Sequence, residues 1–146
     1  MLNIEVVTPE RTVAKVEADS LTVPTVSGEI TILPRHIPLV SMIKSGVAIL
    51  RKGREESYLA LSPGFIQVKK DGEILILVES ADRAEELDLQ KIEAAKERAR
   101  QLLLEHAGRE DVAFADAAAA MERELARLKV ARKHATRSGI RIQENE

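Results

Sequence analysis

Cationic side chains gather near the C-terminal end of the 146-residue chain, where no carboxylate neutralises them. No Asp or Glu stands between Leu125 and Gln143. The same stretch carries Arg127, Lys129, Arg132, Lys133, Arg137 and Arg141. Cations near a helix C-terminus interact favourably with the helix dipole, each by roughly 0.3–1 kcal/mol, which explains a bias but not this many uncompensated charges. The run predicts either a solvated helix end or contact with an acidic protein loop, a nucleotide or a nucleic acid.

Side chains that could perform catalysis or hold a metal ion form no recognisable pattern. The three histidines, His36, His106 and His134, are scattered along the chain, and none stands at helical or hairpin spacing to another ligand-like residue. There is no zinc-binding pattern, glycine-rich phosphate loop or nucleophile elbow, and the chain has no cysteine. The sequence therefore predicts a protein that binds partners, has no metal site and is not itself an enzyme.

The overall composition is that of a globular protein, with 45% hydrophobic and 32% charged residues. A net charge of −2 argues against general binding of polyanions. The aromatic residues are limited to Tyr58, Phe65 and Phe114, so platforms for stacking bases are essentially absent. The N-terminus lacks the pattern of a signal peptide, and no apolar run approaches the roughly 18 residues that would span a bilayer. We expect a soluble, intracellular protein that reaches a membrane only through another protein.

The residues that precede position 87 alternate between apolar and polar, as half-buried strands do. Apolar residues share a face at Leu2, Ile4 and Val6, at Leu21 and Val23, at Ile30 and Ile32, at Val47 and Ile49, at Ile66 and Val68, and at Ile74, Ile76 and Val78. Turn residues separate these runs, and Asp71-Gly72 predicts a hairpin with a type I′ turn. Residues 1–86 are therefore expected to form roughly eight to ten short antiparallel strands in a sandwich or barrel.

The pattern becomes helical over residues 87–146. Asp88 can cap a helix that runs to about Ala107 and ends at Gly108, and Asp111 can cap a second helix. The apolar stripes are Ile92, Ala95, Ala99 and Leu102 in the first helix, and Phe114, Ala118, Met121, Leu125 and Leu128 in the second. Because only a short connection joins them, the two helices are expected to pack as an antiparallel hairpin.

The second helix contains four consecutive alanines, Ala117–Ala120. Alanine favours the helical conformation but buries little apolar area. A helix held by alanines therefore packs closely while gaining little free energy per residue. This suggests that the hairpin has a folded and an extended arrangement that are close in free energy.

Three segments, in order and at matching spacing, resemble the epsilon subunit of F-type ATP synthases, which is called delta in mitochondria. They are residues 27–38 (SGEITILPRHIP), residues 62–68 (SPGFIQV) and residues 81–88 (ADRAEELD). The resemblance spans nearly the whole chain. The sequence departs from the family at Thr31 and Arg35, where glycine is usual, and at Pro63, which replaces the middle glycine of its segment. Arg35 thus puts a charged residue in a turn that normally allows positive φ.

The resemblance implies an N-terminal antiparallel β-sandwich of about ten strands followed by a C-terminal antiparallel α-helical hairpin. It also implies a non-catalytic subunit of the rotating central stalk, bound to the gamma subunit and to the membrane ring of c subunits, and peripheral to the cytoplasmic side of a bacterial inner membrane. Glu29 and His36 are the implied contacts on the side of the ring and gamma. The hairpin is expected to inhibit ATP hydrolysis when Arg127, Lys129, Arg132 and Lys133 meet an acidic loop of the catalytic beta subunit, so that alpha and beta are further partners.

Some members of this family bind ATP between the hairpin helices as a regulatory ligand. Their motif resembles residues 87–92 (LDLQKI), where Lys91 replaces an arginine and Ile92 replaces an alanine. Lysine keeps the charge but loses the planar fork of the guanidinium. The residues implied for such a site are Asp82, Asp88, Lys91, Arg98, Arg123 and Arg127. An interpretation of this set as ordinary exposed helix charges is at least as well supported by the sequence. The resemblance implies no required cofactor.

A second functional class is a free-standing module that binds nucleic acid or an acidic protein through its basic C-terminal helix. The net charge of −2 and the absence of aromatic residues among the cations argue against nucleic acid. The expectation is therefore a rotor subunit with no nucleic-acid partner.

Overall fold

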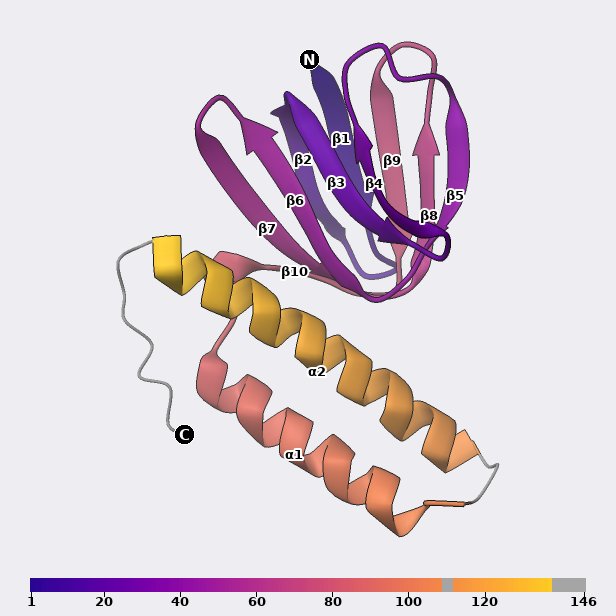
Figure 1. Ribbon diagram of the computed structural model, residues 1–146, viewed down its shortest axis with the longest axis vertical. Coiled ribbons are helices and arrows are strands. Elements are labelled where there is room, and N and C mark those ends of the chain that lie inside the picture. Colours follow the sequence, from indigo (N-terminus) through magenta and orange to yellow (C-terminus); the bar gives the residue numbers. More distant parts are fainter. Residues whose placement is uncertain (109–111, 138–146) are drawn as a thin grey trace.

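The computed structural model describes residues 1–108 and 112–137, and it contains strands followed by two helices (Figure 1). The strands are β1 (Leu2–Val7), β2 (Thr12–Ala18), β3 (Ser20–Thr25), β4 (Gly28–Ile32), β5 (Leu39–Ile43), β6 (Gly46–Lys52), β7 (Glu55–Leu61), β8 (Gly64–Val68), β9 (Glu73–Val78) and β10 (Ala81–Arg83). A short 3-10 helix, η1 (Ala84–Glu86), leads to α1 (Leu89–Glu105) and α2 (Val112–Arg137). The predicted order of a β-sandwich and a helical hairpin is confirmed.

The ten strands form one sheet that folds over on itself into a nearly closed sandwich. The strand order is β10-β7-β6-β3-β5-β8-β9-β1-β2, and β4 pairs with β3 as a branch from this path. Every pair is antiparallel except β1 with β9, which run parallel. The sandwich is thus antiparallel, as expected, apart from this one pair. Most of the sandwich separates β1 from β9 along the chain, so no hairpin turn dictates their relative direction.

The interior of the sandwich is built from aliphatic side chains on the predicted inward positions. Leu2, Ile4 and Val6 are buried, and so are the alternate apolar residues of β8 and β9. The face of β6 differs from the expected one, because Ala48 and Leu50 point into the sandwich core whereas Val47 and Ile49 pack on its outside. Alternation shows that a strand has two different faces but does not say which of two apolar faces is innermost.

The hairpin between β8 and β9 forms where it was predicted, but its turn is of a different kind. Gly72 has a φ of +85°, whereas Asp71 does not enter the positive-φ region that a type I′ turn requires of both central residues. The loop is longer than two residues, with the amide of Gly72 donating to the carbonyl of Lys69 at 3.3 Å. The Asp71 side chain instead accepts a hydrogen bond from the amide of Glu73.

The first helix begins at the predicted residue and ends at Glu105, two residues before the predicted end at about Ala107. The carboxylate of Asp88 accepts hydrogen bonds from the amides of Gln90 and Lys91, at 2.9 and 3.4 Å, and so caps α1. Gly108 follows the helix with a φ of +80°, which a residue with a side chain rarely adopts. Within the predicted stripe of α1, Ile92 and Ala99 are buried but Leu102 is exposed. The predicted cap of the second helix, Asp111, lies outside the described residues.

Helix α2 lies between α1 and the outer face of β6 and β7, so it is covered on two sides (Figure 1). Toward α1, Leu128 and Ala131 pack against Ile92. Toward the sheet, Ala126 and Val130 belong to a second apolar cluster that contains Tyr58 of β7. Of the stripe predicted for this helix, Leu128 is buried but Leu125 is exposed. The residues that face the sheet were not predicted, because they include small side chains that carry little periodic signal.

Val130 is the residue whose truncation should loosen α2 from the sheet, since its side chain is fully buried there. Val130→Ala removes two carbon groups, at about 0.8 kcal/mol each, which corresponds to a roughly tenfold increase in local opening. We expect faster amide hydrogen exchange throughout α2, with the core strands unaffected. Leu125→Ala is the matched control, because Leu125 of the same helix is 41% exposed. Equal loss of protection in the strands and in α2 would contradict a separately held helix.

Candidate functional site

Glu29 stands at the start of β4, directly after the tight turn that joins β3 to β4. Gly28 has a φ of +119°, and the hydroxyl of Thr25 donates a hydrogen bond to its carbonyl oxygen. This turn leaves the side chain of Glu29 exposed, with Pro24 as its cross-strand partner. The turn therefore presents the exposed carboxylate of Glu29 at the end of a hairpin, where another protein can reach it.

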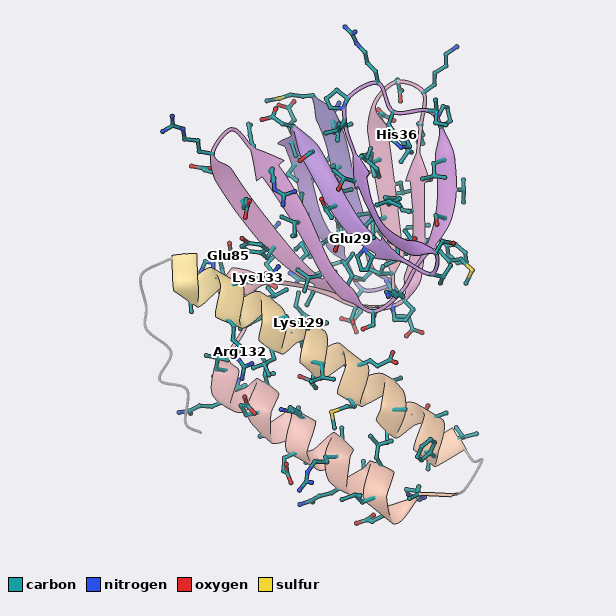
Figure 2. All side chains as sticks on the ribbon, viewed as in Figure 1. Glu29, His36, Glu85, Lys129, Arg132 and Lys133 are labelled. Carbon is teal, nitrogen blue, oxygen red and sulfur yellow. The ribbon has the colours of Figure 1, made fainter. Side chains whose placement is uncertain are left out.

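His36 lies beyond the other end of β4, so the structure does not bring it next to Glu29 (Figure 2). The amide of His36 donates to the carbonyl of Leu33, which closes a turn in which Arg35 has a φ of +69°. Pro34 followed by a positive φ is the arrangement of a type II turn. The charged Arg35 therefore adopts the glycine-like conformation that its position in the sequence suggested. The Nδ1 atom of His36 lies 2.7 Å from the carbonyl oxygen of Ile37 and so donates to it.

An exposed apolar row crosses the outer face of β5, β8 and β9. Met42, Phe65 and Leu77 are direct cross-strand neighbours, and they are 53%, 52% and 46% exposed. Beside them a hollow of about 470 Å³ is lined also by Pro9 and Pro63. We call Met42, Phe65 and Leu77 the apolar row. A contiguous patch of large apolar side chains on a soluble domain is typical of a protein contact.

The apolar row was not predicted from the sequence, although a signal for it exists. Residues 74–78 are a continuous apolar run without alternation. Such a run indicates a strand that is covered on both faces. The inner face is covered by the sandwich, which leaves the outer face for a partner.

Lys129, Arg132 and Lys133 lie along the C-terminal part of α2 (Figure 2). All three are exposed, and the ammonium of Lys133 also lies 5.5 Å from the centre of the Tyr58 ring on β7. This distance permits a cation–π interaction, which helps to hold the end of α2 on the sheet. Arg137 belongs to the helix, and Arg141 lies outside the described residues.

Arg127 faces the sheet instead of solvent. Its Nε donates to Asp82 of β10 at 2.7 Å, and its Nη1 donates to Glu124 at 2.6 Å. Burial disfavours the charged form of the guanidinium, but the two carboxylates more than offset this and the pKa of Arg127 is raised. In this arrangement Arg127 is therefore committed to contacts within the chain.

The six side chains implied for an ATP site are only partly brought together. Asp82 and Arg127 are in direct contact, and Asp88 is engaged as the cap of α1. Lys91, Arg98 and Arg123 are exposed on the two helices. Among residues 1–108 and 112–137, no group of His, Asp and Glu side chains is arranged to hold a metal ion. In the same part of the chain, no helix is long and apolar enough to cross a membrane.

Comparisons with known proteins agree with this architecture. The family model of the ATP synthase delta/epsilon chain, beta-sandwich domain, matches residues 1–84. The ATP synthase epsilon chain of Moorella thermoacetica is 40% identical over 131 residues, which cover 89% of this chain and 96% of that protein. That of Halalkalibacterium halodurans is 39% identical over 130 residues, with the same coverage.

A solved structure shares the fold at lower sequence identity. A chain in the cryo-EM structure of the Euglena gracilis mitochondrial ATP synthase, described as OSCP/F1/c-ring in rotational state 1, has a TM-score of 0.73 and 23% identity. The match covers 89% of this chain and 80% of that one. The sandwich, the helical hairpin and the matches over most of the sequence lead to one conclusion: this chain belongs to the ATP synthase delta/epsilon family.

Proposed function

We propose that the chain is a non-catalytic rotor subunit in the central stalk of an F-type ATP synthase. In this role it couples proton translocation through the c ring to ATP synthesis in the catalytic head. The main support is that the sandwich has two separate outer faces, of which only one is covered by another part of the chain. The hairpin covers β6 and β7, while the apolar row on β5, β8 and β9 stays exposed. One face can therefore hold a permanent partner while the other holds a helix that moves.

The apolar row is the proposed docking surface for the gamma subunit, and Glu29 is the proposed contact with the c ring. An apolar face suits a long-lived interface, in which the fully buried centre is depleted of charge. A single exposed carboxylate at a hairpin tip suits a weaker interaction, as expected if the contact with the ring must not be tight during rotation. Through these two partners the chain would sit at the cytoplasmic side of a bacterial inner membrane without entering it.

The hairpin is the proposed brake on ATP hydrolysis. Lys129, Arg132 and Lys133 are already exposed when α2 is docked, and Lys133 also lies over Tyr58. Arg127 is held by Asp82 and Glu124. If α2 leaves the sheet, all four cations become available to an acidic loop of the catalytic beta subunit. The same departure exposes Val130 and Ala126, so the extended form needs a partner surface to cover them.

Phe65→Glu should prevent association with the gamma subunit, because it places a carboxylate at the centre of an apolar contact. Co-expression of the two chains followed by affinity purification measures this. Leu102→Glu is the matched control, since Leu102 is exposed to a similar degree, 46%, but lies on α1. Recovery of gamma with Phe65→Glu at the parent level would exclude the apolar row as the docking surface.

Glu29→Ala should lower the amount of proton pumping per ATP hydrolysed in reconstituted vesicles, because it removes the proposed contact with the ring. The control is Glu17→Ala, which removes an exposed carboxylate from β2 instead. Pumping that is unchanged by Glu29→Ala would remove this residue from the interface.

Neutralising Lys129, Arg132 and Lys133 together by Gln should raise the rate of ATP hydrolysis of the assembled complex severalfold, since the brake loses its electrostatic contact. A triple variant at Lys52, Arg54 and Lys70 removes the same charge from exposed parts of the sandwich and should leave the rate unchanged. Equal hydrolysis by the first variant and the parent complex would refute the proposed inhibition.

A further inference from the structure

Helix α2 buries a carboxylate that the proposed function does not use. Glu124 is 4% exposed, and it is the only charged residue that is buried within residues 1–108 and 112–135. Burial of a carboxylate is unfavourable unless cations and hydrogen-bond donors compensate for the lost water. The residues that surround Glu124 should therefore explain why it is there.

A single oxygen of Glu124 lies between two arginines. Its Oε1 accepts from Nη1 of Arg127 at 2.6 Å and lies 3.7 Å from Nε of Arg123. Because Arg123 and Arg127 are four residues apart, their side chains start from the same face of the helix. Two guanidinium groups that converge on one oxygen form an arrangement that also suits a phosphate oxygen. Here Oε1 of Glu124 takes the position that a phosphate oxygen could occupy.

The far side of Arg127 is also occupied. Nε of Arg127 donates to Oδ2 of Asp82 at 2.7 Å, and the side chains of this pair are 23% and 25% exposed. Arg127 thus lies between two carboxylates, one from its own helix and one from β10. A phosphate that approached it would meet two negative charges at close range and would have to displace at least one of them.

The space between the helices at the level of the ATP-like motif is filled as well. Ile92 is 4% exposed and packs against Leu128 and Ala131 of α2. Asp88, another residue implied for the nucleotide, is engaged with backbone amides at the start of α1. The residues of this chain therefore do not fit ATP as a ligand of the docked hairpin.

We propose that Glu124 is an internal anion that fills an oligophosphate site formed by Arg123 and Arg127. It orients Arg127 for its hydrogen bond to Asp82 and so holds the hairpin in the docked form without a bound nucleotide. Replacement of Glu124 by a neutral residue opens the site to oligophosphates. The inference concerns the regulation of the hairpin on which the proposed brake depends, but it is a property of the isolated chain, so it stands or falls separately from the rotor function.

Calorimetric titration of the isolated full chain with inorganic tripolyphosphate and with ATP tests this proposal. The parent chain should give no heat with either ligand at millimolar concentration. Glu124→Gln should bind both at least tenfold more tightly than the parent, and with similar affinity to each other, because Ile92 leaves no room for a base to add contacts. Glu122→Gln is the matched control, since it removes an exposed carboxylate two residues away and should gain no binding.

The double variant Glu124→Gln/Arg127→Gln should lose the binding that Glu124→Gln gains. If Glu124→Gln weakens the fold, far-ultraviolet circular dichroism should show helix recovered on addition of tripolyphosphate, because a ligand of the folded form shifts the equilibrium toward it. The proposal is overturned if the parent binds as tightly as Glu124→Gln, if Glu122→Gln gains the same affinity, or if Glu124→Gln shows neither heat nor recovered helix.

Discussion

The docking of α2 on the outer face of β6 and β7 is the contact that determines where the helical hairpin lies on the sandwich. Its apolar part is small, with Ala126 and Val130 packed against Tyr58, so its hydrophobic stabilisation is modest. The ionic part links Arg127 to Asp82 of β10. Since desolvation offsets much of the attraction within a partly buried ion pair, this pair contributes more to the register of α2 on the sheet than to the free energy of docking.

A modest contact suits the detachment of α2 that we propose, and the core and the other outer surfaces of the sandwich do not involve this helix. The core that holds the strands together lies inside the sheet and does not include α2. The apolar row lies on other strands than those that α2 covers. The proposed movement of the hairpin and the proposed attachment of a partner to the apolar row would therefore be mechanically separate.

Much of the fold was predictable because its signals are local. Alternation of apolar and polar residues predicted most of the strands and their buried faces. Asp88 predicted the start of α1, because aspartate is a favoured N-cap residue. The parallel pairing of β1 with β9 was not predictable, because no turn joins these strands. Glu124 was missed because an acid among arginines on a helix resembles an exposed ion pair in the sequence. Its burial depends on Arg127 turning toward Asp82, which is 45 residues away along the chain.

The central claim, that α2 rests on β7 in the free chain and leaves it in the assembled enzyme, can be measured directly as a distance. The sequence has no cysteine, so Ser57→Cys on β7 and Glu122→Cys on α2 offer two exposed positions for spin labels. We predict one narrow distance distribution by pulsed electron paramagnetic resonance for the isolated chain without nucleotide. In the complex under conditions that favour hydrolysis, a second and longer distance should appear. A broad distribution in the isolated chain, or an unchanged single distance in the inhibited complex, would contradict this account.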